Sequence, residues 1–346
     1  MSIFSADSSF VGLDLGTTAI RVVELKSIGA TKKFITYGQI PIPSAVATSD
    51  SGIDRQKMGS AIKELMTKAR VSTKNVAFGL SSNKVFTTVV DIDKLPEAEL
   101  AKAIRYQADS IIPTEIAESK IDWSVVGESP VNTNKLEILL SSVTNEYIES
   151  QLDFIESIGL NAVAFEPDNL AMSRALLAPE IASPQMVLDI GYKTTDLVIA
   201  MNGAPRLTRS VPTGMESIIR AAVQNLNIEQ KQAEQFIYKF GLVQGKLEGQ
   251  TYKSIVGTVD SIVSDIQKSI KFFSARYSNN SISKIIISGT ATTIPEFASY
   301  IANKTGISVE IGNAWRNVSY PQSRQEELLG IASSFATAVG LAERKL

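Results

Sequence analysis

Cysteine and histidine are both absent from this chain of 346 residues. Without cysteine the protein has no disulfides and no thiolate chemistry. Without histidine it lacks the Ser–His–Asp triad, the usual zinc sites and the most common general base. Any chemistry must therefore use carboxylates, hydroxyls, Lys or Arg and backbone groups, together with a hard cation such as Mg²⁺.

Long apolar runs and an excess of either charge are also missing. No uninterrupted apolar run approaches the roughly 20 residues that a membrane helix needs, and the N-terminus lacks the basic and apolar regions of a signal peptide. The 34 basic and 36 acidic residues give a net charge of −2, which offers no electrostatic case for nucleic acid. We therefore expect a cytoplasmic protein with no nucleic-acid partner and no direct membrane insertion, and docking on a membrane through a partner stays open.

The length exceeds what one hydrophobic core usually serves, so we expect two lobes. Residues 10–25 read as a strand, a Gly-Thr-Thr turn and a strand. With a third strand at 34–42, a helix at 54–69 and a strand at 76–80 they form a βββαβ unit. Residues 186–199 repeat the opening pattern. The alignment suggests an internal duplication with a two-residue insertion in the second copy.

Three further segments show a clear pattern. Residues 84–165 form a second block with a strand, a helix, two strands and a helix that ends at Gly159. Apolar residues from 255 to 277 recur every three or four positions, which predicts a long amphipathic helix, and a buried strand follows at 284–290. Residues 326–345 predict a final helix.

The two glycine-containing turns carry the candidate chemistry. A hairpin tip with glycine and threonine offers backbone N–H groups and hydroxyls to a phosphate, and an Asp before the tip suits a hydrated Mg²⁺. These residues are Asp14, Gly16, Thr17 and Thr18 in the first copy, and Asp189, Gly191, Thr194 and Thr195 in the second. Each tip alone is equally explained as a tight turn, and it is the repetition that favours a function.

The same residues resemble motifs of the actin, sugar-kinase and heat-shock ATPase superfamily. Residues 11–18 resemble its phosphate-1 motif, and residues 189–196 resemble phosphate-2. Ser288, Gly289 and Thr290 resemble the adenosine motif, although Thr290 replaces its second glycine. The resemblance implies that ATP and Mg²⁺ are the cofactors.

Two charged residues have competing interpretations. Glu166 lies in a Phe-Glu-Pro sequence that resembles the connecting motif, whose Glu orients the attacking water beside Asp14 and Asp189. The alternative is that Glu166 only opens the helix near Asp168. Arg21 stands where some relatives carry a phosphate-facing Lys, and the alternative is a solvated charge on a strand.

Nearly the whole chain resembles the PilM family of type IV pilus assembly, which is itself similar to FtsA. The matching segments are residues 11–26, 104–113, 265–273 and 338–342. The resemblance implies an α/β actin-like ATPase fold with ribonuclease H-like duplicated lobes and an inserted 1C subdomain. We expect subdomain 1A at 1–83, 166–184 and 326–346, 1C at 84–165, 2A at 185–213 and 284–325, and 2B at 214–283.

The family pattern implies further nucleotide contacts and at most slow ATPase activity. Glu234 belongs to an Ala-Glu-x-x-Lys motif whose Lys is replaced by Ile237. Gly214 stands where relatives have paired glycines. Lys268 and Ser269 match an Arg-Ser pair in a family helix. We therefore expect binding more than fast hydrolysis.

The resemblance also implies partners. A groove near the junction of 1A and 1C is expected to accept the N-terminal cytoplasmic tail of a PilN-like bitopic membrane protein. Residues 111–113 are a candidate exposed rim of that groove, with core packing as the alternative. Other pilus motor and platform proteins and self-association are further candidates. The expected location is the cytoplasmic face of the inner membrane.

Three alternatives stay open. A small-molecule kinase uses the same lobes, but we see no substrate-binding constellation. An FtsA-like division protein ends in a basic amphipathic membrane-targeting helix, whereas this chain ends with only Arg344 and Lys345 as basic residues. A scaffold that binds nucleotide without hydrolysis differs little from the main interpretation.

Overall fold

The computed structural model describes residues 9–29, 31–178 and 182–345. The chain divides into two compact units. Unit 1 contains the chain up to Ser81, then Glu146–Leu176 and the chain from Asn313 onward, and unit 2 contains Ser82–Asn145 and Leu177–Gly312. The four predicted subdomains divide the chain more finely than this and stay a prediction.

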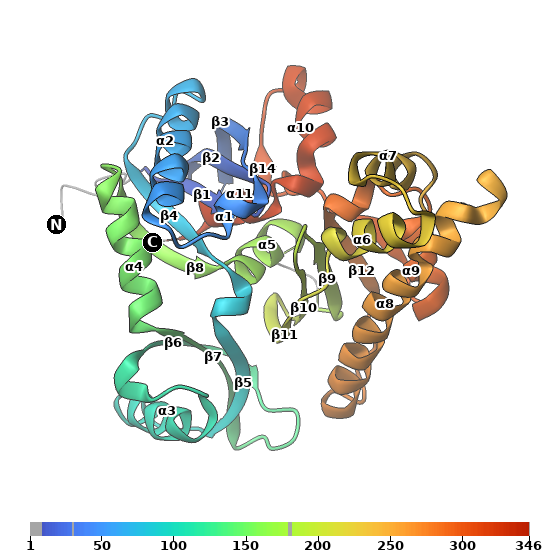
Figure 1. The fold of residues 1–346 in the computed structure, drawn as a ribbon. Coiled ribbons are helices and arrows are strands. Elements are labelled where there is room, and N and C mark those ends of the chain that lie inside the picture. The colour runs from blue at the N-terminus through green and yellow to red at the C-terminus, as the bar shows by residue number, and fades with distance from the viewer. Residues whose placement is uncertain (1–8, 30, 179–181, 346) are drawn as a thin grey trace. The chain divides into compact units, whose positions relative to one another are not determined.

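Unit 1 is built on a six-stranded sheet in the order β14-β3-β2-β1-β4-β8 (Figure 1). Its strands are β1 (Val11–Leu15), β2 (Ala19–Ile28), β3 (Thr31–Pro41), β4 (Asn75–Leu80), β8 (Asn161–Pro167) and β14 (Val318–Ser319). Strands β1, β2 and β3 are antiparallel neighbours, whereas β4 runs parallel to β1 and β8 parallel to β4. The predicted βββαβ order is confirmed.

Helices cover both faces of this sheet. They are α1 (Ser44–Ala47), α2 (Gly52–Lys68), α4 (Asn145–Ser157), α5 (Asp168–Leu176), α10 (Gln325–Ile331) and α11 (Ala336–Glu343). A Cβ atom on Gly38 would lie 2.9 Å from Leu65, so α2 packs closely on one face. A Cβ atom on Gly12 would lie 2.2 Å from the carbonyl oxygen of Ala338, so α11 packs against β1 on the other face. Glycine at these two positions allows the helices to approach the sheet.

The predicted continuous final helix is wrong. A 3-10 turn at Ala332–Ser334 separates α10 from α11, and Phe335 has the non-helical angles φ −104° and ψ 9°. The turn directs the fully buried ring of Phe335 to an aromatic cluster, with its centroid 5.2 Å from that of Tyr37 and 6.0 Å from that of Trp315. Burial of this ring outweighs the continuity of the helix.

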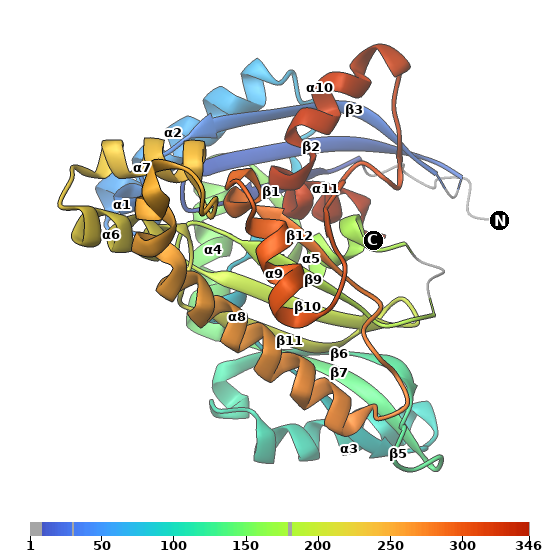
Figure 2. The same cartoon turned by 90° about the vertical axis from the view of Figure 1, so that its right-hand side faces the viewer.

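Unit 2 contains a five-stranded sheet in the order β11-β10-β9-β12-β13 (Figure 2). Its strands are β9 (Gln185–Ile190), β10 (Thr195–Met201), β11 (Ala204–Val211), β12 (Lys284–Gly289) and β13 (Val309–Ile311). Again the first three strands are antiparallel and the last two are parallel to the first. This pairing repeats that of β3-β2-β1-β4-β8, so the internal duplication is present in the fold.

The predicted two-residue insertion between the copies is wrong. The β1–β2 hairpin closes with the pair Leu15 and Ile20, and the β9–β10 hairpin closes with Ile190 and Thr195. Four residues separate the partners in both hairpins. Matching the threonines by letter misplaced the second loop, because Thr195 already belongs to the strand.

Helices α6 (Met215–Leu226), α7 (Gln230–Phe240), α8 (Gln250–Arg276) and α9 (Phe297–Thr305) complete this part of unit 2. The predicted long amphipathic helix is α8. Its apolar stripe, which includes Ile255, Val259, Ile262, Ile266 and Phe273, lies in the core of the five-stranded sheet and its helices.

A second part of unit 2 is a three-stranded antiparallel sheet in the order β5-β7-β6 with one helix. Its elements are β5 (Phe86–Asp93), α3 (Glu97–Ile111), β6 (Ser119–Glu128) and β7 (Lys135–Thr144). Ile112 is 7% exposed and packs in the core of this part, so of the two interpretations core packing holds for Ile112 and the exposed rim does not. Pro113 is exposed.

Candidate functional site

The first candidate hairpin joins β1 to β2 in unit 1. Asp14, at the end of β1, is opposite Arg21, and Nη1 of Arg21 lies 3.5 Å from Oδ2 of Asp14. A Cβ atom on Gly16 would lie 2.8 Å from the carbonyl oxygen of Ala19 and 3.0 Å from Nη1 of Arg21. Glycine therefore allows the tip to fold tightly against the ion pair. Thr17 and Thr18 lie half-buried in the tip.

Arg21 is held in place by an aromatic ring. Its guanidinium carbon lies 5.8 Å from the ring centroid of Phe335, and only 14% of its side chain is exposed. A cation over a ring is attracted by the negative face of the π system. These contacts rule out the interpretation of Arg21 as a freely solvated charge. Sequence reasoning missed Phe335, which is far away in the chain.

The second candidate hairpin joins β9 to β10 in unit 2 and brings two carboxylates together. Asp189 is opposite Asp196 in the strand pair, and Ser288 donates a 2.5 Å hydrogen bond to Oδ1 of Asp189. Burial raises the pKa of Asp196 to about 7, and the nearby charge of Asp189 adds to the effect. Thr194 donates to Oδ2 of Asp196 over 3.4 Å.

Asp196 was not among the predicted site residues. A signal for it exists in the sequence, because Asp196 follows Asp189 at the same seven-residue spacing at which Arg21 follows Asp14. In both hairpins this spacing makes the two residues direct neighbours across the strand pair.

The adenosine-like motif packs on the end of β9. Gly289 has φ +83°, and a Cβ atom there would lie 2.4 Å from the carbonyl oxygen of Ile190 and 2.9 Å from Oδ1 of Asp189. Thr290 donates its hydroxyl to the same Ile190 carbonyl over 3.1 Å. The structure therefore brings residues 288–290 and the phosphate-2 hairpin together, and Gly289 is required by both conformation and space.

The start of α6 is joined to the tip of the same hairpin. Met215 and Glu216 donate their backbone N–H groups to the carbonyls of Gly191 and Tyr192 over 3.0 and 2.8 Å. A Cβ atom on Gly214 would lie 2.7 Å from both of these carbonyl oxygens. Glycine at position 214 therefore allows the start of α6 to lie against the hairpin tip, and the next residue, Met215, is fully buried in the core of unit 2.

Helix α7 lies beside this tip. Burial raises the pKa of Tyr192, and the charges of Glu216 and Glu234 act in the same direction, so Glu234 is close to the tip. Gln230 donates to Glu234 over 2.8 Å. Ile237 is fully buried in the core of unit 2, so its position on α7 provides no basic group.

The side chains of three other predicted site residues form bonds within the fold. Thr195 is 3% exposed and donates its hydroxyl to the carbonyl of Thr213 over 2.7 Å, so this hydroxyl is already used inside the fold. Ser269 is buried and donates to the carbonyl of Asp265, and the exposed Lys268 pairs with the carboxylate of Asp265. Among the described residues, neither Ser269 nor Lys268 forms a hydrogen bond or ion pair with the hairpin.

Glu166 is buried in an ion cluster of unit 1. Its two carboxylate oxygens accept from the Nη1 and Nη2 atoms of Arg174, and Nη1 of Arg344 lies 3.2 Å from Oε2. Glu166 precedes α5 as the sequence suggested. Because arginines occupy its carboxylate, orientation of a water molecule by Glu166 requires that they move, and this role stays a prediction.

The donors around Asp189 suit a hard cation. Two carboxylates and the hydroxyls of Ser288 and Thr194 are all oxygen ligands, which is what Mg²⁺ prefers, and Mg²⁺ usually keeps several waters. Within the described ranges, no three acidic side chains gather into a metal site of their own. The residues therefore fit a hydrated Mg²⁺ more than a fully protein-coordinated ion.

None of the helices in the described part of the chain combines the length and hydropathy required to cross a bilayer.

The sequence is 25% identical over 264 residues to the cell division protein FtsA of Neisseria meningitidis serogroup B. That alignment covers 68% of this chain and 62% of FtsA, less than two thirds of the relative's length. The structure is similar to the PilM-PilN type IV pilus biogenesis complex, with a TM-score of 0.82, 23% identity, and coverage of 97% of this chain and 98% of that one.

It is also similar to MreB5 of Spiroplasma citri bound to ADP, with a TM-score of 0.56, 13% identity, and coverage of 96% and 94% of the two chains. These likenesses confirm the predicted actin-like ATPase fold. The sequence also matches the family model described as type IV pilus assembly protein PilM over residues 12–346. This match spans almost the whole sequence, and the chain therefore belongs to the PilM family of type IV pilus assembly proteins.

Proposed function

We propose that this protein is a nucleotide-binding component of type IV pilus assembly. It binds ATP with Mg²⁺ and docks the N-terminal cytoplasmic tail of a PilN-like single-pass membrane protein at the cytoplasmic face of the inner membrane. Family membership supports the assignment to pilus assembly. The observation that carries nucleotide binding is the pair of matched hairpins, each with an Asp before a glycine tip at the same register.

Each hairpin contributes a different set of groups. In unit 1, Asp14 steers the hydrated Mg²⁺, and Arg21 stabilises phosphate charge from its place on the Phe335 ring. In unit 2, Asp189 and Ser288 offer oxygen atoms to a hydrated Mg²⁺, and Gly289 allows the nucleotide to approach the backbone. The structure of MreB5 with ADP supports nucleotide binding by this fold.

Hydrolysis is proposed to be slow. The second lobe places Ile237 in the core at the position where relatives carry a Lys, and Glu166 is tied to Arg174. Without these two groups, phosphoryl transfer loses charge stabilisation and positioning of the attacking water. The nucleotide then acts mainly as a ligand that selects a conformation.

Thermal unfolding with and without ATP and Mg²⁺ tests the site. At a ligand concentration of about 100 Kd the wild-type protein gains about 2.7 kcal/mol, which raises its Tm. Asp14→Asn and Asp189→Asn each abolish this rise, measured against the same variant without ligand. Asp153→Asn, an exposed carboxylate on α4, retains it and serves as the control. An unaltered rise in both site variants removes the proposed site, and loss in only one of them contradicts the use of both hairpins.

The partner proposal is tested on membranes. The structure of a PilM-PilN complex supports a PilN-like partner for this chain. Crosslinking followed by mass spectrometry is expected to recover a single-pass membrane protein joined to residues of the three-stranded sheet part. Deletion of that protein's cytoplasmic tail abolishes the crosslink. Persistence of the crosslink after this deletion contradicts docking through the tail.

A second candidate is an FtsA-like role in cell division, favoured by the similarity to FtsA. Pelleting with lipid vesicles separates the two. A pilus component that docks through a protein stays in the supernatant with bare vesicles and pellets only when the tail-bearing partner is present. Pelleting with bare vesicles supports the FtsA-like role instead.

A further inference from the structure

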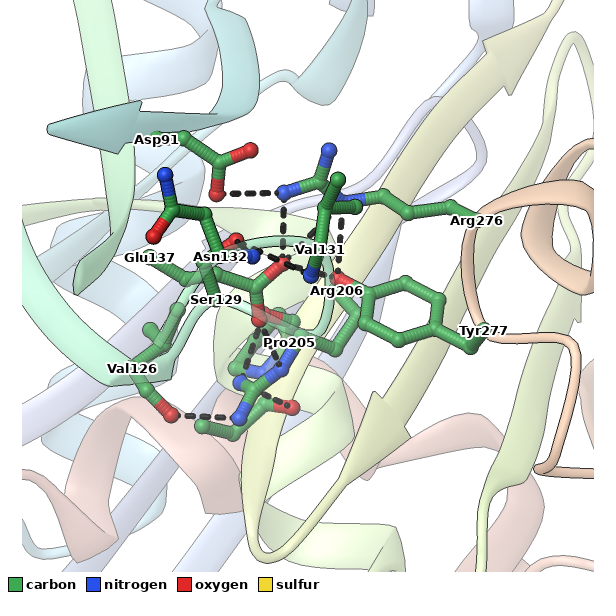
Figure 3. A network of polar contacts seen from close by, with 11 residues as sticks. Asp91, Val126, Ser129, Val131, Asn132, Glu137, Pro205, Arg206, Arg276 and Tyr277 are labelled. Carbon is green, nitrogen blue, oxygen red and sulfur yellow. Dashed lines mark hydrogen bonds and ion pairs between the residues drawn. The ribbon is translucent and has the colours of Figure 1, made fainter. Parts of the chain in front are cut away.

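Glu137, at the centre of the three-stranded sheet, is a carboxylate without exposed surface. Its Oε1 atom accepts from Nε and Nη2 of Arg276 over 3.0 and 2.8 Å and from the hydroxyl of Tyr277 over 2.6 Å. Nε of Arg206 forms an ion pair with Oε2 over 3.0 Å. Figure 3 shows the two guanidinium groups converging on this one side chain. We call these residues, with Asp91, the Glu137 cluster.

The Glu137 cluster lies where the two parts of unit 2 meet. Glu137 and Asp91 come from β7 and β5 of the three-stranded sheet, whereas Arg206 comes from β11 and Arg276 from the end of α8. Nη2 of Arg276 also pairs with Asp91 over 2.7 Å. The two parts have separate hydrophobic cores, and Tyr277 belongs to that of the five-stranded sheet. The junction between the cores is therefore ionic at this point.

A β-bulge in β6 makes room for the side chain of Arg206 in the cluster. The register of β6 and β7 shifts between Val125 and Gly127, which removes Val126 from the ladder. The freed carbonyl of Val126 accepts from Nη2 of Arg206. A Cβ atom on Gly127 would lie 2.9 Å from the same Nη2, so glycine keeps this approach open. The strand is thus locally adapted to receive a guanidinium from β11.

The charges of the cluster balance, with two carboxylates and two guanidinium groups. Burial lowers the pKa of Arg206, and the charge of Glu137 opposes this. Burial also acts to lower the pKa of Arg276, but its hydrogen bonds to Glu137, Tyr277 and Asp91 outweigh it and raise that pKa. Well-packed apolar residues would often stabilise such a junction at least as well. The ionic arrangement makes each part of unit 2 depend on the other, because loss of a charged partner from one part leaves a buried charge uncompensated in the other.

We infer that the Glu137 cluster couples the two parts of unit 2, so that the three-stranded sheet follows movements of the five-stranded sheet. Arg206 lies on β11, which pairs with β10, and β10 begins at the phosphate-2 hairpin. The register of this pair shifts between Ile199 and Ala200, which leaves Arg206 in a bulge. The strand pair therefore connects the hairpin to the bulge that carries Arg206. The inference has a regulatory part, in which the cluster transmits the nucleotide state to the proposed partner-binding part. This regulatory part rests on the proposed function.

Hydrogen exchange of the full chain without nucleotide tests the coupling itself. In Glu137→Gln, an NH₂ group replaces one carboxylate oxygen, so the negative charge that balances Arg206 and Arg276 is lost. Amide exchange in residues 119–144 is expected to accelerate by about tenfold or more, while exchange in 185–201 stays as in the wild type. Glu128→Gln is the matched control, because Glu128 is an exposed glutamate on β6 that pairs with Lys94.

Either of two results overturns the inference. Equal acceleration in 119–144 and 185–201 shows that the cluster only stabilises unit 2 as a whole. Unchanged exchange in both regions shows that the two parts do not depend on it. If Glu137→Gln does not fold, Tyr277→Phe provides the test, because it removes the two hydrogen bonds of the Tyr277 hydroxyl, to Glu137 and from Arg276, and leaves all four charges. It is expected to give the same pattern with an acceleration of about threefold to tenfold.

Addition of ATP and Mg²⁺ tests the regulatory part. In the wild type, nucleotide is expected to change exchange both in the hairpin region 185–201 and in 119–144. In Glu137→Gln the change in 185–201 remains and that in 119–144 disappears. Retention of both changes overturns the regulatory inference. If nucleotide produces no change in the wild type, the proposed nucleotide site fails, and the comparison without nucleotide still decides whether the cluster couples the two parts.

Discussion

Glu343 offers the sharpest test of the electrostatics of unit 1. It is the last residue of α11 and is 8% exposed. Burial raises its pKa to about 8, although Arg174 and Lys32 pull the pKa down. Its Oε1 atom has no hydrogen-bond partner among the described residues. A carboxylate at a helix C-terminus is also disfavoured by the helix dipole. Substitution by Gln keeps the shape and removes the charge.

The sign follows from proton binding. Between the ordinary pKa of 4.5 and about 8 the folded protein keeps a proton on Glu343 that the unfolded chain has lost. The free energy of unfolding of the wild type therefore falls as pH rises through this window. At 1.36 kcal/mol for each pKa unit, the full effect is about 5 kcal/mol. Gln removes this loss, but Lys32 and Arg174 lose a partner, so we expect a gain of about 2–4 kcal/mol at pH 9 and of less than about 1 kcal/mol at pH 5.

Urea unfolding at the two pH values measures this difference. The protein contains two tryptophans, and only Trp315 lies in unit 1. In a Trp123→Phe background, the fluorescence of the buried Trp315 reports the unfolding of unit 1 alone. Glu326→Gln, an exposed glutamate on α10, is the control and is expected to change stability by less than about 0.5 kcal/mol at both pH values.

A pH-independent effect of Glu343→Gln would refute the reasoning. If Gln destabilises unit 1 equally at pH 5 and pH 9, Glu343 of the folded protein is ionised at both pH values. Its pairing with Lys32 and Arg174 then outweighs the effect of burial. If the gain is larger at pH 5 than at pH 9, the sign of the pKa shift itself is wrong.

Three further substitutions test the packing and the site. Gly340→Ala is expected to destabilise unit 1 by about 3 kcal/mol in urea unfolding, because its Cβ atom would lie 1.8 Å from the carbonyl oxygen of Ala171. A loss of stability below about 1 kcal/mol would contradict the close contact of α11 and α5. Gly289→Ala is expected to lower the free energy of unfolding by about 2–3 kcal/mol and to abolish the ATP-dependent rise in Tm, because of its φ of +83° and the contact with Ile190. A retained rise in Tm would place the nucleotide elsewhere. Arg21→Gln is expected to weaken ATP binding about tenfold in isothermal titration with little effect on stability, and unchanged affinity would remove Arg21 from the phosphate site.

The local sequence pattern was enough to predict most helices and strands and part of the candidate site. The periodicity of α8 and the short apolar runs of β1 and β9 depend on neighbours within one element, so they can be read from the chain itself. The Asp and Gly of each hairpin are likewise close in sequence, and the structure places both pairs at equivalent positions. The final helix was mispredicted because the burial of Phe335 is a tertiary effect.

What the sequence by itself determined is the duplicated βββαβ plan, the two Asp-Gly hairpins and the exclusion of thiol and imidazole chemistry. Only the tertiary structure decided the equal length of the two loops and the neutralisation of Glu137 by Arg276, which lies 139 residues away. The physical reason is that helix and strand periods repeat over a few residues. The register of strands and the burial of charge depend instead on which distant segments meet, and no local pattern specifies that.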